Sequence, residues 1–117
     1  MIVETLHTSD GLWGEAGTDF VEVRLGERWV NLIGQCVNLC ECDTTLDPVR
    51  HEVIGNAELS WAHMYTLSAI PEHVLVRHHS VACRTWAGLV KNLTDTYGPD
   101  KIGGAAFVAV LGIRRWD

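Results

Sequence analysis

Two side chains of opposite charge, Glu22 and Arg24, stand two residues apart in a segment of aromatic and β-branched residues. That composition predicts a strand over 20–25, so both side chains leave the same face, beside Phe20. A carboxylate accepts hydrogen bonds and a guanidinium donates a bidentate pair, so together they can bind a planar polar ligand. The same spacing also fits a structural ion pair, and the sequence leaves both interpretations open.

The length and apolar content of the chain predict one domain over residues 1–117. Of the 117 residues, 47% are hydrophobic, which is enough for a proper core. The sequence has no run of 18 or more apolar residues, so no membrane span is predicted. The first residues lack a basic region followed by a long apolar stretch, so no signal peptide is predicted. We therefore expect a cytoplasmic protein.

Charged residues are distributed unevenly. The net charge of −6 argues against a general binder of duplex DNA or of membrane surfaces, because such proteins are basic. Residues 1–60 carry 11 acidic and 3 basic side chains, a net charge of −8, whereas residues 61–117 carry 4 acidic and 6 basic ones, a net charge of +2. An anionic ligand should approach the second half, where Arg77 and Arg84 lie; a solvated surface is the alternative. His78 and His79 follow Arg77 at the end of a predicted helix, where exposure is expected.

Three of the four cysteines lie close together in the sequence. Cys36, Cys40 and Cys42 form a C-x3-C-x-C pattern on one predicted strand, and Cys83 stands alone. Side chains at i and i+2 of a strand stand about 6–7 Å apart, which is wide for two ligands of one zinc ion. Cysteine also packs as a small buried hydrophobe, and disulfides are rare in a reducing cytosol. We therefore expect no metal ion, no other cofactor and no disulfide.

The hydrophobic pattern predicts more strand than helix. Strands are predicted over 2–6, 20–25, 35–42, 50–61 and 104–113, with an irregularity at Gly55, and helices over 71–78 and 86–97. The second helix has Thr85 as N-cap and an apolar face in which Trp86, Leu89, Val90 and Leu93 should be buried. This order favours an α+β fold with a small barrel of five to six strands and two helices packed against it. An open α+β sheet is the alternative.

Five tryptophans are a high number for a chain of this length. An indole offers a face on which a planar ring can stack. Trp13 and Trp29 lie in predicted glycine-containing loops and are candidates for such a contact, with burial as the alternative for each.

Residues 17–24 resemble the signature of the ASCH domain family, relatives of the PUA RNA-binding barrels. That signature reads Gly-x-Lys-x-x-Glu-x-Arg, and Gly17, Glu22 and Arg24 stand at the matching positions. Shorter likenesses extend the resemblance over residues 17–114, at 30–35, 51–55, 70–72, 85–86, 97–98 and the final strand. The resemblance implies a PUA-like barrel with a cleft between barrel and helices that binds RNA or a modified nucleotide.

One position departs from the family pattern, because Asp19 stands where the signature has lysine. Some ASCH-like proteins remove acetyl from acetylated cytidine, and the lysine is catalytic in them. These enzymes also have a threonine where this chain has Glu22. An aspartate supplies neither the positive charge nor the amine, so we do not expect that reaction here.

Three classes of function follow from these observations. The first is a binding module for RNA or a modified nucleotide, whose ligand contacts would be Glu22, Arg24, Trp29, Arg77 and His79. The second is a small hydrolase or ribonuclease, for which Asp19 and Glu22 are candidate catalytic residues. The third is a protein-interaction or inhibitory module. The sequence leaves the oligomeric state open, a homodimer included.

Overall fold

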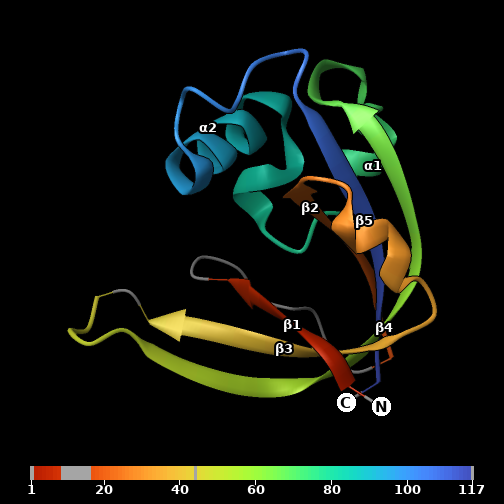
Figure 1. Ribbon diagram of the computed structural model, residues 1–117, viewed down its shortest axis with the longest axis vertical. Helices are drawn as coiled ribbons and strands as arrows, with labels where there is room; N and C mark the ends of the chain where they lie inside the picture. The colour runs from red at the N-terminus through yellow and green to blue at the C-terminus, as the bar shows by residue number, and fades with distance from the viewer. Residues whose placement is uncertain (1, 9–16, 44, 117) are drawn as a thin grey trace.

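The computed structural model describes residues 2–8, 17–43 and 45–116. The strands are β1 (Ile2–Thr8), β2 (Asp19–Leu25), β3 (Cys36–Asp43), β4 (Arg50–Thr66) and β5 (Phe107–Arg115) (Figure 1). The helices are α1 (Glu72–Leu75) and α2 (Trp86–Tyr97), with short 3-10 helices η1 (Arg28–Leu32), η2 (Leu67–Ala69) and η3 (Val81–Arg84). Among these residues no helix is both long and apolar enough to cross a membrane.

The strands form one mixed sheet in the order β1-β3-β4-β5-β2. The pair β1 and β3 is parallel, and the other neighbours are antiparallel. Figure 1 shows β4 as a long curved strand that runs alongside β3 and then alongside β5. Its pairing shifts register between Gly55 and Val53, so the irregularity predicted at Gly55 is confirmed, and it shifts again between Leu59 and Trp61. Each register shift marks an extra residue on β4, and such a residue bends a strand. The bends allow β4 to pair with β3 along its first part and with β5 along its second part.

The sheet is open, so the predicted closed barrel is wrong, whereas the α+β class with five strands and two helices is confirmed. β1 and β2 are the two edge strands. The free edge of β2 pairs with residues 77–79 instead of with β1. Val21 N donates to Arg77 O at 2.9 Å, and His79 N donates to Val21 O at 3.1 Å. Residues 77–79 thus form hydrogen bonds with backbone groups of β2 that would pair with β1 in a closed barrel.

Alternation along β2 separates two apolar clusters. Val21 and Val23 face a cluster shared with α1, η3 and α2, while Phe20 faces an inner cluster with β3, β4 and Trp29 of η1. Glu22 and Arg24 leave the same face as Phe20, as the spacing predicts. The polar pair therefore lies on the inner side of a strand whose other side anchors the helices.

The amphipathic helix lies close to where the sequence predicts it. The Thr85 side chain accepts from Gly88 N at 3.2 Å, and Gly98 ends the helix with a positive φ of 94°. Leu89 and Leu93 are buried, and Val90 is half-buried.

Trp86 is 45% exposed, so its predicted place in the core is wrong. It occupies the first turn of α2, where one edge of the indole reaches η2 and its Nε1 donates to Leu67 O at 3.4 Å. Helical periodicity assigns a residue to a face, but it does not show how far along the helix the packing partner extends.

Leu93→Ala should lower the free energy of unfolding by about 2–5 kcal/mol, because the side chain is buried between α2 and the sheet and its removal leaves a cavity. Urea denaturation monitored by tryptophan fluorescence measures the change. Leu46→Ala is the matched control, since Leu46 is 45% exposed and its truncation should change stability by no more than about 0.5 kcal/mol. Equal losses in the two variants would contradict this packing.

Candidate ligand pocket

A pocket of about 230 Å³ lies between β2, residues 78–83 and α2, with the ends of β1 and β3 on its other side. Its lining combines charged, polar and apolar groups, namely His7, Glu22, Val23, Arg24, Cys42, His78, His79, Cys83, Asn92, Leu93, Thr96 and Tyr97. The mixture of a few convergent polar groups with apolar wall is typical of small-molecule sites.

The carboxylate of Glu22 is the buried centre of this pocket, with 6% of the residue exposed. Its Oε1 accepts from Val23 N at 2.8 Å and lies 3.2 Å from His78 Nε2. Its Oε2 accepts from His79 Nε2 at 2.8 Å and from Arg24 Nη2 at 3.3 Å. A carboxylate offers about four acceptor directions, so these partners use its whole capacity. Glu22 therefore organises the pocket and has no acceptor position left for an amine of a ligand.

The two histidines reach Glu22 because residues 77–79 pair along the edge of β2. His78 Nδ1 accepts from Ser80 N at 2.9 Å, so the proton of that ring is on Nε2, which donates to Glu22. The rings of His78 and His79 lie with centroids 4.6 Å apart, and His79 also meets Phe20 edge-on at 5.8 Å. Both histidines are buried, which corrects the expectation that they are exposed at a helix end.

The pKa of Glu22 lies well below its ordinary value of 4.5. Burial alone would raise the pKa, because it penalises the charged form. The positive charge of Arg24 and the hydrogen bonds from His78 and His79 outweigh burial and stabilise the carboxylate. At neutral pH the pocket therefore contains a negatively charged carboxylate that the charge of Arg24 and the two histidine hydrogen bonds stabilise.

Arg24 connects the two edges of the open sheet. Its Nη2 donates to the carbonyl oxygen of His7 on β1 as well as to Glu22. Its Nε is buried and has no hydrogen-bond partner among the described residues. Nearby, the Tyr97 hydroxyl accepts from Leu25 N at 3.3 Å, which leaves its own proton to donate elsewhere. Arg24 and Tyr97, which both line the pocket, thus supply hydrogen-bond donors at its wall.

Of the residues that the sequence singles out, Glu22, Arg24 and His79 line this pocket, and Asp19, Trp29 and Arg77 do not. Asp19 is exposed on β2 and pairs with Arg114 Nε at 2.9 Å. Trp29 is buried in the inner cluster, with the Arg24 guanidinium 5.9 Å from its ring centroid. Arg77 is exposed and contributes its backbone carbonyl to β2. Trp13 lies outside the described residues.

Sequence reasoning missed His78, Cys42 and Tyr97 as pocket residues. Cys42 belongs to the C-x3-C-x-C pattern, Tyr97 to the likeness at 97–98 and His78 to a neighbouring pair of histidines. None of these patterns predicts a pocket, because each residue reaches the pocket through a contact between distant segments.

Glu22, His78 and His79 bring their side-chain oxygens and nitrogens within 4.8 Å of one another, as metal ligands would be. The guanidinium of Arg24 is 3.3 Å from the same carboxylate, and a second cation would be repelled there. This group therefore suits an internal ion-pair network better than a metal ion.

Comparisons with protein-family models, with curated proteins and with solved structures find no match for this chain.

Glu22→Gln should lower the free energy of unfolding by about 3–5 kcal/mol at pH 7, because it leaves the Arg24 charge without its buried partner. Since folding depresses the pKa of Glu22, its contribution is complete above pH 4.5 and is lost as pH falls through the folded-state pKa. The difference between wild type and variant should therefore shrink below pH 4.5 in urea titrations. Glu52→Gln, which removes the exposed partner of Arg50, is the control and should cost much less. A pH-independent difference would contradict the charged state of Glu22.

Proposed function

We propose that this protein is an RNA- or nucleotide-binding module of the ASCH type, and that its pocket receives a nucleobase or a modified base. The observation that carries this proposal is the buried Nε–H of Arg24, which lacks a partner among the described residues beside a carboxylate that is already saturated. A buried donor without a partner costs about 1–3 kcal/mol, which a bound acceptor would recover. The pocket therefore favours a ligand that brings acceptor atoms.

Nucleobases supply such acceptors as carbonyl oxygens and ring nitrogens, and arginine binds them well. The Tyr97 hydroxyl can donate to a second acceptor, because Leu25 N occupies only its oxygen. In this proposal Arg24 and Tyr97 donate hydrogen bonds to the ligand. Glu22 holds Arg24 and the two histidines in place. The role of Glu22 thus changes from the ligand contact predicted from sequence to a positioning residue.

Phosphate groups would meet basic side chains beside the pocket. Arg84 is exposed, and its Nε donates to His78 O at 2.8 Å, so this side chain lies next to the histidine pair. Arg77 is exposed one residue before that pair. These two cations support a nucleotide or an RNA strand as ligand rather than an uncharged metabolite.

The ASCH assignment is supported by what the signature residues do in this fold. Gly17 has a φ of +81°, a conformation that side-chain-bearing residues rarely adopt, and its N donates to Arg115 O at 2.8 Å. Glu22 and Arg24 share the pocket between the sheet and α2, where the resemblance places the family's cleft. We include a reducing, cytoplasmic location in the proposal, since none of the four cysteines forms a disulfide.

Binding rather than hydrolysis is our first choice because Asp19, which replaces the family's catalytic lysine, pairs with Arg114 outside the pocket. A hydrolase acting on a nucleoside or RNA is the second candidate. One observation favours it: His79 is oriented by Glu22 at 2.8 Å, which is how a carboxylate positions a general base.

Arg24→Lys should weaken ligand binding about 10-fold or more, because lysine keeps the charge beside Glu22 but loses the planar donor fork, worth about 1–3 kcal/mol at a base edge. Isothermal titration of the full chain with cytidine, uridine, acetylcytidine and short RNAs measures the affinity. RNA binding should weaken as salt rises, and nucleoside binding should not. Arg28→Lys is the matched control, since Arg28 lies over Trp29 at 4.6 Å, outside the pocket lining.

Failure of wild-type protein to bind any of these ligands would overturn the proposal, as would equal losses in the Arg24 and Arg28 variants. Turnover of acetylcytidine or RNA by the wild type that disappears in His79→Gln would replace the binding module with the hydrolase.

A further inference from the structure

Four potential metal ligands from three strands share one face of the sheet. His7 of β1 lies directly opposite Cys40 of β3, and Cys42 of β3 lies directly opposite His51 of β4. Opposite residues in a ladder present their side chains on the same side. The two ladders therefore gather two thiols and two imidazoles at one end of β3.

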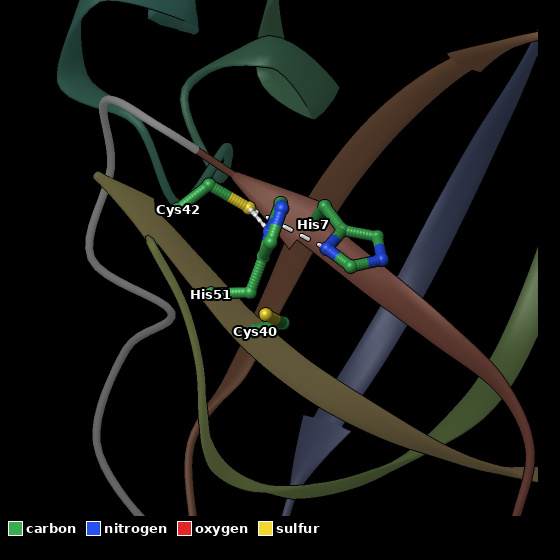
Figure 2. Close-up of side chains that lie close together, drawn as sticks. All are labelled: His7, Cys40, Cys42 and His51. Atoms are coloured by element: carbon green, nitrogen blue, oxygen red, sulfur yellow. Dashed lines mark hydrogen bonds between the residues drawn. The ribbon is translucent and has the colours of Figure 1, made fainter. Parts of the chain in front are cut away.

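The ligand atoms of these four residues converge. The sulfurs of Cys40 and Cys42 and one ring nitrogen from each of His7 and His51 all lie within 4.8 Å of one another. Cys42 Sγ is 3.0 Å from His51 Nδ1 and 3.4 Å from His7 Nδ1. Figure 2 shows the side chains of Cys42, His51 and His7 turned toward one another, with the sulfur of Cys40 close by.

We propose that His7, Cys40, Cys42 and His51 form a structural zinc site. In a tetrahedral site, Zn–S bonds of about 2.3 Å and Zn–N bonds of about 2.0–2.1 Å separate neighbouring ligand atoms by about 3.3–3.8 Å. Of the distances in this group, 3.0 Å lies just below that range and 3.4 Å lies within it, and no two of the four ligand atoms are more than 4.8 Å apart. Rotations about side-chain bonds would therefore bring all four ligand atoms to zinc-binding distance.

The donor set fits zinc chemically. Two cysteines and two histidines make a closed four-ligand site, which is the structural rather than the catalytic kind. As zinc binds, two S–H bonds are replaced by two Zn–S bonds and two protons are released to solvent, while the imidazoles bind through neutral nitrogens. The two thiolate charges neutralise Zn²⁺, so no further counter-ion is needed.

The expectation of no metal came from distances along a single strand. Cys40 and Cys42 are indeed an i, i+2 pair, and Cys36 is too far along β3 to contribute. Cross-strand neighbours, however, have Cβ atoms about 4.5–5.5 Å apart, so the histidines close the site from both sides. A disulfide between Cys40 and Cys42 is disfavoured, because it needs Cβ atoms about 3.5–4.5 Å apart.

The zinc ion would join the edge strand β1 to β3 and β4. β1 is an edge strand whose ladder is with β3, and a ligand on each of β1, β3 and β4 joins all three. His7 and Cys42 also line the ligand pocket, so zinc would fix one of its walls. This inference does not depend on what the pocket binds.

Purified full-length protein loaded with Zn²⁺ should contain one equivalent per chain by elemental analysis. At about tenfold excess over its dissociation constant, zinc should raise Tm by about 5 °C, and a chelator should reverse the rise. Titration with Co²⁺ in place of zinc should give the visible bands of tetrahedral cobalt and a near-ultraviolet thiolate-to-cobalt band. The thiolate band identifies the sulfur ligands and excludes the Glu22–His78–His79 group, which contains no sulfur.

Cys42→Ser and His51→Ala should each weaken cobalt binding by more than about 100-fold, because each removes a direct ligand. Cys36→Ser and His63→Ala are the matched controls, with a cysteine of the same strand and an exposed histidine of β4 outside the cluster. They should bind cobalt like the wild type.

Absence of the thiolate band from wild-type protein at micromolar Co²⁺ would overturn the proposal without any variant. A loss in Cys36→Ser equal to that in Cys42→Ser would overturn it as well. Because these readouts use metal alone, they stand or fall separately from nucleotide binding.

Discussion

A buried carboxylate, that of Glu22, is the constraint on which the rest of the structure depends. An ionised group in the interior is tolerated only when neighbouring charges and donors replace the water that it lost. Arg24, His78 and His79 do so here, and they come from β2 and from a segment more than 50 residues later. Docking residues 77–79 against β2 satisfies the carboxylate and the strand edge together, and the sheet consequently stays open.

The open sheet places two chemically different groups side by side. On one side of the pocket, hydrogen-bond donors surround a carboxylate that is already neutralised. On the other side, two thiols and two imidazoles from β1, β3 and β4 converge. Arg24 links the two, because one of its nitrogens contacts both Glu22 and the backbone of His7. A shift of β1 would therefore change the position of the pocket wall that His7 and Cys42 form.

Local patterns in the sequence predicted the order of the elements, although the helix predicted over 71–78 covers only Glu72–Leu75 and the strand predicted over 50–61 continues to Thr66. Alternation along β2 correctly placed Glu22 and Arg24 on one face, and the cap at Thr85 correctly located the start of α2. The irregularity at Gly55 was also predictable, because glycine inside an apolar strand marks a bulge. Each of these features depends only on residues close to it in the sequence, within a turn or two of a helix or a few positions of a strand. A single segment is therefore enough to predict it.

Contacts between distant segments were decided by the tertiary structure. The sequence determined that Glu22 and Arg24 would be neighbours, but not that two histidines would saturate the carboxylate or that Arg24 Nε would have no hydrogen-bond partner among the described residues. It determined the spacing of Cys40 and Cys42, but not that His7 and His51 would lie opposite them. It also could not show that β2 would pair with residues 77–79 and keep the sheet open. The physical reason is that strand register comes from pairing and packing across the whole fold, whereas periodicity reports only the face on which a residue lies.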